Sequence, residues 1–115
     1  MDLTFHDKHG VAVVRIVGEL DDMRSKELGQ LFDRLLAEGR RQFVIDLKDV
    51  GFIDSSGLAM LVRCFQRARR SAASLSLADL TPPVLRTFEL TRLDRAFDIR
   101  TDVAEAIRHC TGKES

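Results

Sequence analysis

The amino-acid sequence predicts a single α/β domain with a mostly parallel central sheet flanked by helices. Its 115 residues match the length of one domain, and 44% hydrophobic with 31% charged residues is typical of a folded globular chain. After two β-rich segments, short apolar runs alternate with amphipathic helical segments, and such alternation favours a parallel sheet. The expected order is β-β-α-β-α-β-α-β-α, with one antiparallel edge strand. One domain is expected over residues 1–115, with a core of about 3–110 and a polar tail at 111–115.

The two β-rich segments at the start of the chain predict a hairpin. Residues 3–8 partly alternate between apolar and polar side chains, and residues 11–17 are rich in β-branched side chains. Gly10 lies between them, in a break typical of a turn. This hairpin supplies the expected antiparallel strand at the edge of the sheet.

An amphipathic helix is expected after the hairpin. Asp21 or Asp22 is its N-cap, because a carboxylate accepts hydrogen bonds from the free N–H groups of a first helical turn. Gly39 is expected just past its end, where glycine adopts a left-handed backbone without strain. Apolar residues recur at helical spacing and define the buried face: Leu28, Leu31, Phe32, Leu35 and Leu36.

A continuous apolar strand at residues 42–47 is expected to be covered on both faces, as central parallel strands are. Residues 48–54, with Gly51, are expected to form a loop that leads into a second helix. On that helix Arg63 and Arg67 are expected to face outward, either as a basic patch for a partner or as charges that interact favourably with the helix C-terminus. The buried face is expected to consist of Leu58, Leu61, Val62 and Phe65.

The last third of the chain predicts two more strands and two more helices. A strand is expected at residues 75–80, followed by a helix with Thr81 as its cap and Pro82 at its first position. A short fifth strand is expected at residues 96–99, and Thr101 and Asp102 are expected at the cap of the last helix. The apolar face of that helix is Val103, Ala106, Ile107 and Cys110.

The composition argues against several classes of partner. Lys and Arg together number 18, as do Asp and Glu, so the chain lacks the positive surplus that drives binding to nucleic acid or acidic membrane surfaces. It has no Trp and no Tyr to form a stacking platform for bases. No apolar run approaches the ~20 residues of a membrane span, and no secretory signal opens the chain. We therefore expect a cytoplasmic protein without direct contact to nucleic acid or membrane.

The cysteines and histidines do not indicate a metal or redox centre. Cys64 and Cys110 have no CxxC or Cys/His ligand spacing around them, so reduced structural thiols are expected. The three histidines (His6, His9 and His109) likewise form no metal signature.

The segment Asp54-Ser55-Ser56-Gly57 is the most informative part of the sequence. It joins a buried strand to the first turn of a helix, where free N–H groups and the helix dipole stabilise an anion, including a phosphate esterified to a serine. The alternative is that Asp54 or Ser55 is only an N-cap in a tight turn. Neither a Gly-x-Ser-x-Gly nucleophile turn nor a Gly-rich phosphate loop is present, so an enzyme is not expected.

Four motifs resemble those of STAS domains, specifically the small anti-sigma factor antagonists of bacteria. The first is the segment from Asp46 to Leu58, which ends in Phe-Ile-Asp-Ser-Ser-Gly-Leu. Residues 18–21 resemble the family's turn before the first helix, residues 80–84 its strand-to-helix segment, and residues 88–97 the stretch before its last strand. The resemblance covers about residues 3–110. One departure lies at Arg92, where the family often has glycine.

The resemblance implies a partner switch controlled by phosphorylation. In the family, the unphosphorylated antagonist binds an anti-sigma factor that is also a serine kinase, and a sigma factor is released. The kinase phosphorylates the first serine of the motif, which is Ser55 here, and a serine phosphatase resets the protein. ATP and Mg²⁺ belong to the kinase, and no cofactor is expected in this chain. Ser56 is a rival acceptor.

The residues around Ser55 are the expected contact surface for that partner. Asp21, Asp54, Ser56 and Gly57 are expected close to the phosphate acceptor, and Arg63 and Arg67 on the exposed face of the following helix. For both aspartates, a turn or capping role is the alternative. An alternative function also stays open: a stand-alone STAS interaction module of another assembly, such as an accessory subunit of lipid transport or a stress-signalling scaffold.

Overall fold

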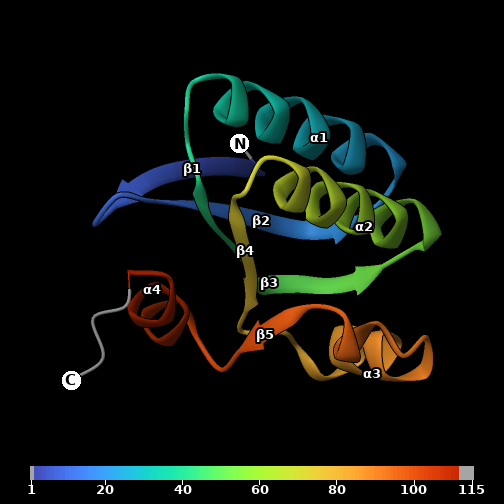
Figure 1. Ribbon diagram of the computed structural model, residues 1–115. Coiled ribbons are helices and arrows are strands. Elements are labelled where there is room, and N and C mark those ends of the chain that lie inside the picture. Colours follow the sequence, from blue (N-terminus) through green and yellow to red (C-terminus); the bar gives the residue numbers. More distant parts are fainter. Residues whose placement is uncertain (1, 112–115) are drawn as a thin grey trace.

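The computed structural model describes residues 2–111, which form a five-stranded sheet with helices on both faces (Figure 1). The element order agrees with the expected one, apart from a short 3-10 helix, η1, before the last strand. The elements are β1 Leu3–Lys8, β2 Val11–Leu20, α1 Asp22–Ala37, β3 Gln42–Ile53, α2 Ser55–Arg70, β4 Ser74–Ala78, α3 Pro82–Leu90, η1 Leu93–Arg95, β5 Asp98–Arg100 and α4 Val103–Thr111.

The strands lie in the sheet in their order along the chain, β1-β2-β3-β4-β5. The edge strand β1 pairs antiparallel with β2, and every other pair is parallel. The prediction of a mostly parallel sheet with one antiparallel edge strand is therefore confirmed. Because the parallel strands share one direction, the carboxyl ends of β2 and β3 lie at the same edge of the sheet.

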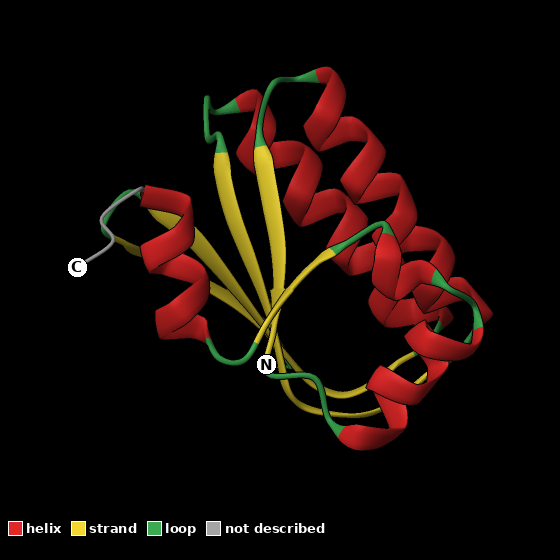
Figure 2. Ribbon diagram, turned by 60° about the horizontal axis from the view of Figure 1, so that its bottom comes forward, coloured by secondary structure: helices red, strands yellow, loops and turns green. Residues whose placement is uncertain are grey.

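The sheet separates two apolar clusters of unequal size, and helices cover both of its faces (Figure 2). Helices α1, α2 and α3 pack on one face over the larger cluster, in which the rings of Phe32 and Phe43 lie 4.6 Å apart. Helix α4 alone covers part of the other face, where Ala106 and Ile107 pack on residues of β2, β3 and β4. The carboxyl ends of β2 and β3 extend past α4, so one face of these strand ends is exposed.

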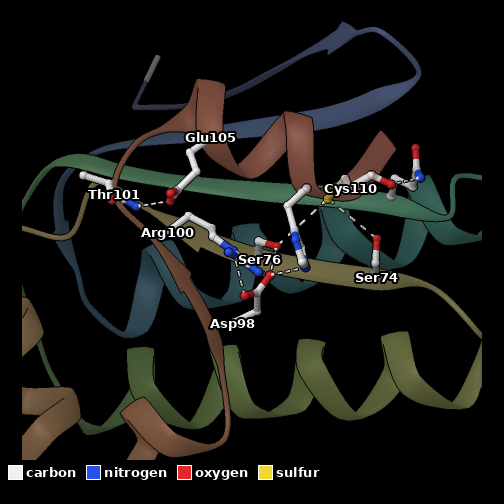
Figure 3. Close-up of polar contacts among 9 residues, drawn as sticks. Ser74, Ser76, Asp98, Arg100, Thr101, Glu105 and Cys110 are labelled. Atoms are coloured by element: carbon white, nitrogen blue, oxygen red, sulfur yellow. Dashed lines mark hydrogen bonds and ion pairs between the residues drawn. The ribbon is translucent and has the colours of Figure 1, made fainter. Parts of the chain in front are cut away.

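Polar contacts hold α4 and β5 against the sheet (Figure 3). The buried hydroxyl of Ser76 donates to the carboxylate of Asp98 at 2.6 Å, and the same carboxylate pairs with Nε of Arg100 at 2.8 Å. Gln42 Nε2 donates to the carbonyl oxygen of Cys110 at 2.7 Å. These contacts connect β3, β4, β5 and α4 and explain how a nine-residue helix is kept at this position.

The two cysteines are free thiols in different surroundings. Cys64 is buried in α2, and burial raises the pKa of its thiol to about 12. Cys110 is half-buried in α4, with its sulfur 3.8 Å from Oγ of Ser74. No helix of residues 2–111 combines the length and apolar character needed to cross a membrane.

The prediction of a loop at residues 48–54 is wrong, because β3 continues to Ile53. Its last residues pair with residues 17–20 of β2, which extends that strand as well. Two register shifts in β2, between Arg15 and Val17 and between Gly18 and Glu19, keep the two strands paired through this region. Gly51 is therefore a strand residue and not part of a loop.

The other differences from the expected elements are local. The fourth strand ends at Ala78, and the fifth covers Asp98–Arg100, because the backbone N–H groups of Ala96 and Phe97 donate to the carbonyl oxygen of Leu93 in η1 and not to β4. Thr81 is the N-cap residue of α3, but its hydroxyl donates to the carbonyl oxygen of Val50 at 2.8 Å instead of capping the helix. Of the expected polar tail, residue 111 ends α4 and residues 112–115 lie outside the described part of the chain.

The buried face of α2 differs in part from the predicted one. Leu61 is fully buried, and Leu58, Val62 and Phe65 are partly buried against the larger cluster. The remaining buried positions of the helix are small or sulfur-containing residues that the apolar periodicity did not single out: Gly57, Cys64 and Ala68.

Candidate functional site

The N-termini of α1 and α2 lie side by side at the carboxyl ends of β2 and β3 (Figure 1). Leu20 and Ile53 form the last pair of the β2–β3 ladder, and each is followed directly by the aspartate that opens a helix. The backbone N–H of Asp54 donates to the carbonyl oxygen of Leu20 at 3.3 Å, which ties the two junctions together. Asp21 and Asp54 therefore occupy equivalent positions in neighbouring strand-to-helix junctions.

Both aspartates are N-caps with nearly the same geometry. Oδ1 of Asp21 accepts the backbone N–H of Arg24 at 3.0 Å, and Oδ1 of Asp54 accepts the backbone N–H of Gly57 at 2.9 Å. Each aspartate has extended backbone angles, as a cap residue does. The capping role that the sequence gave as the alternative for each residue is confirmed, and Asp21 rather than Asp22 caps α1.

Ser55 is the first residue of α2, and its side chain is exposed. In the described part of the chain its hydroxyl has no hydrogen-bond partner, so it is accessible to a second protein. Ser56, the next residue, is only half exposed. The first turn of α2 contains no acidic residue, whereas α1 has Asp22 at its first position. Apart from its cap Asp54, the positive end of the α2 dipole therefore meets no carboxylate within that turn.

Gly57 is buried directly beneath the two serines, where α2 approaches the end of β2. A Cβ atom at this position would lie 2.5 Å from the carbonyl oxygen of Leu20 and 2.7 Å from Cγ1 of Ile53. Neither distance is tolerated between nonbonded atoms, so only glycine allows the helix to pack this closely. Gly57 thus fixes the position of Ser55 by packing and does not itself lie on the surface.

The two arginines expected on the outer face of α2 differ in their surroundings. Arg63 is exposed, and it lies seven residues after Ser56, which places both on the same side of the helix. Arg67 pairs with Asp33 of α1 at 2.9 Å and is only partly exposed. This ion pair links α2 to α1, so Arg63 alone is the freely exposed arginine of the expected pair.

Sequence reasoning missed exposed apolar residues at the same edge. Phe52 is 54% exposed near the end of β3, and Met23 is 67% exposed in the first turn of α1. Val17, 38% exposed, lies further back on β2 opposite Asp49, which pairs with Arg15. The hydrogen bond from Arg15 to Asp49 raises the pKa of the arginine. No sequence signal marks Phe52 as exposed, because its neighbours Val50 and Ile53 are apolar and buried.

The chain shows no metal site within residues 2–111, where no group of three or more His, Cys, Asp and Glu side chains is arranged to hold an ion. The site thus consists of two capped helix N-termini, one exposed hydroxyl, several carboxylates and a few exposed apolar side chains. Such a surface is suited to binding a second protein and to carrying a phosphate.

Comparison with known proteins defines the class to which this fold and site belong. A family model described as the STAS domain matches residues 2–106, and the chain belongs to the STAS domain family. It is 30% identical over 112 residues to the anti-sigma F factor antagonist of Paenibacillus polymyxa, which covers 93% of this chain and 94% of that protein. With the anti-sigma-B factor antagonist of Bacillus subtilis strain 168 it shares 34% identity over 86 residues, 75% of this chain and 78% of that protein.

Solved structures agree with this assignment. The crystal structure of an anti-sigma factor antagonist from Mycobacterium paratuberculosis superimposes with a TM-score of 0.85 at 27% identity. The superposition covers 95% of this chain and 92% of that one. Within the STAS family, the chain is thus grouped with the anti-sigma factor antagonists, as the resemblance of its motifs implied.

Proposed function

We propose that the unphosphorylated chain binds an anti-sigma factor that is also a serine kinase and thereby frees a sigma factor, and that phosphorylation of Ser55 ends this binding. The observation that carries the proposal is the exposed, unbonded hydroxyl of Ser55 at a helix N-terminus without an acidic residue in its first turn. The relatives named above support it, since they are antagonists of anti-sigma factors. The chain acts in the cytoplasm as a binding protein and not as an enzyme.

The fold tolerates a phosphate on Ser55. A phosphoserine adds about −1.5 to −2 charges near pH 7. At the first position of α2 that charge interacts favourably with the free N–H groups and the positive end of the helix dipole. Gly57 holds the helix N-terminus tightly against β2, so the phosphate changes the charge of the surface without moving the helix.

The same phosphate weakens the binding of the partner at this edge. Asp54 directly precedes Ser55, and Asp21 lies at the neighbouring junction, so the new charge joins two carboxylates at one edge. A partner surface complementary to the unphosphorylated edge then meets excess negative charge and must remove water from a dianion, and both effects weaken binding. The switch therefore acts through electrostatics at the interface.

The roles of the other components follow from this assignment. The kinase supplies ATP and Mg²⁺, and a serine phosphatase removes the phosphate and returns the chain to its binding form. Ser55 is preferred to Ser56 as the acceptor because Ser55 is exposed and Ser56 is half-buried. Asp54 and Asp21 hold the two helix N-termini in place and shape the charge around the acceptor.

Phosphate mapping tests the proposal. The chain is incubated with ATP, Mg²⁺ and each purified anti-sigma factor kinase of its own genome, and intact mass and peptide mapping follow. One phosphate on Ser55 is expected, with none on the Ser55→Ala variant and an unchanged yield on the Ser56→Ala variant. A chain that stays unmodified, or that is modified only on Ser56, contradicts the proposal. An unmodified chain favours instead an interaction module of another assembly.

A further inference from the structure

Exposed large hydrophobic residues are few in residues 2–111: Val17, Met23, Phe52 and Leu90. Two of them, Met23 and Phe52, belong to the junctions that open α1 and α2, whereas Val17 lies further back on β2 and Leu90 in the last turn of α3. Single exposed apolar side chains are common, but apolar residues that gather beside a functional group mark an interaction site. Met23 and Phe52, at 67% and 54% exposure, are therefore the pair that suggests one.

Met23 and Phe52 belong to the two neighbouring strand-to-helix junctions, one of which carries the phosphate acceptor. Phe52 is three residues before Ser55 and pairs in the ladder with Glu19, one step before the last pair of β2 and β3. Met23 is the second residue of α1, the position that Ser56 occupies in α2. One residue thus comes from the strand that leads to Ser55, and the other from the neighbouring helix N-terminus.

Four carboxylates belong to the same two junctions as these apolar residues. Glu19 is exposed, Asp21 and Asp54 are half exposed, and Asp22 is exposed and pairs with Lys26 at 3.4 Å. The other basic residue in the first turns of α1 and α2 is Arg24, whose guanidinium pairs with Asp2 and Glu27. The edge therefore combines two exposed apolar residues with four carboxylates, as a protein interface with an apolar centre and a charged rim does.

We propose that Met23 and Phe52 are the apolar anchors by which this chain holds its partner, and that the partner offers an apolar pocket rimmed by arginine and lysine. The inference rests on the proposed function, since the partner is the anti-sigma factor kinase that modifies Ser55. Aromatic and methionine side chains are enriched at the centre of interfaces, and a basic rim complements the four carboxylates of the junctions. Ser55 lies at the same junction as Phe52, so a phosphate on Ser55 adds negative charge at the edge that the anchors belong to.

The anchors contribute to binding and not to folding. Both side chains are largely exposed, so their removal leaves the core and the caps of α1 and α2 unchanged. Variants at these positions therefore keep the thermal stability of the wild-type chain. Leu90, 78% exposed, provides a matched control, because it is equally apolar and exposed and lies on α3.

The test compares the affinity of four variants for the purified anti-sigma factor kinase of the same genome that binds the wild-type chain. Phe52→Ala and Met23→Ala are each expected to weaken binding by about tenfold or more, as truncation of an interface anchor does. The double variant is expected to weaken it further, and Leu90→Ala to bind as the wild type does. The Ser55 phosphorylation rate is expected to show a raised KM with an unchanged kcat for both anchor variants.

The possible results separate the two proposals. A wild-type chain that binds no anti-sigma factor overturns the proposed function and the anchors with it. A wild-type chain that binds while Phe52→Ala and Met23→Ala bind equally well overturns the anchors alone. Affinity that does not fall as salt is raised contradicts the basic rim, because rim charges are screened over about 10 Å at 0.1 M salt.

Discussion

The β2–α1 and β3–α2 junctions are two versions of one construction. In each, a parallel strand ends in an apolar residue, and an aspartate then caps the helix through the N–H three residues later. Two of their differences bear on charge and packing: Asp22 corresponds to Ser55, and Arg24 corresponds to Gly57. The first junction has a permanent carboxylate at its first helical position, and the second has the exposed hydroxyl that we propose as the phosphate acceptor.

The second difference sets how closely each helix approaches the sheet. A side chain as long as that of Arg24 fits at α1, where it pairs with Asp2, whereas any Cβ at Gly57 overlaps the end of β2. The α2 N-terminus is therefore the more tightly packed of the two. The comparison shows that the junction with the exposed serine is also the one whose helix is packed more closely against the sheet.

Gly57→Ala should cause the largest loss of stability, because the added Cβ would lie 2.5 Å from the Leu20 carbonyl oxygen. We expect a loss of about 3 kcal/mol in the free energy of unfolding, as for overpacking of a well-packed site. Urea denaturation measures the loss. Gly51→Ala is the control, since no atom lies within 4 Å of its added Cβ. Equal stability of the two variants would show that α2 is not tightly packed at this junction.

Removal of either cap tests the equivalence of the two junctions. Asp21→Ala and Asp54→Ala should each lower the free energy of unfolding by about 1 kcal/mol, because each leaves one N–H of a first turn unpaired. Asp→Asn at the same positions should restore most of the loss, since the amide oxygen accepts the same hydrogen bond. Thermal denaturation of the four variants checks this. A cap whose removal has no effect would mean that the junctions are not alike.

Adding a charge at the first position of α2 and removing one at the first position of α1 should change the stability in opposite directions, by smaller amounts. Ser55→Asp should stabilise the chain and Asp22→Ser should destabilise it, each by about 0.5 kcal/mol at low salt, because an anion interacts favourably with a helix N-terminus. Both effects should shrink at high salt. Thermal denaturation at two salt concentrations measures them. A large fall in Tm for Ser55→Asp would contradict a switch that leaves the fold intact.

Cys64 reports on the opening of α2. Burial raises the pKa of its thiol to about 12, so in the folded chain it stays protonated at pH 8 and a thiol reagent reaches it only when α2 opens. Ser55→Asp should leave the labelling rate of Cys64 unchanged, and Gly57→Ala should increase it. Mass spectrometry of the labelled peptides measures both rates, with Cys110 as the internal reference. Faster labelling in Ser55→Asp would show that charge at this position loosens the helix.

The same thiol gives the direction of a pH effect. The ordinary thiol pKa is 9.0, and in the folded chain it is about 12. Above pH 9 the unfolded chain therefore binds fewer protons at Cys64 than the folded chain does, and stability falls as the pH rises toward 12. The variant Cys64→Ala should lack this part of the alkaline destabilisation.

The sequence predicted the features that depend on neighbouring residues. Both aspartate caps, the exposed serine at the start of α2 and the end of α1 near Gly39 follow from local patterns, and Gly39 has the left-handed backbone expected of it. Arg92 also adopts a left-handed backbone, where relatives often have glycine, and nothing in the local sequence indicates this.

The features that the sequence did not predict depend on distant residues. Residues 48–53 were expected in a loop because they contain Gly51 and follow the continuous apolar run, but they pair with β2 over two register shifts. Helical periodicity placed Arg67 outward, and only the packing of α1 beside it brings Asp33 within 2.9 Å. The close approach at Gly57 likewise depends on Leu20, which lies 37 positions earlier in the chain.

Binding of the two forms of the chain to its anti-sigma factor tests the central claim most directly. Calorimetry with unphosphorylated and Ser55-phosphorylated chain gives the two affinities, and backbone NMR spectra of both free forms report on the fold. We expect phosphorylation to weaken binding by about thirtyfold or more, with chemical-shift changes confined to the two junctions. Equal affinities, or shift changes spread across the sheet, would contradict a switch that acts by charge on a rigid support.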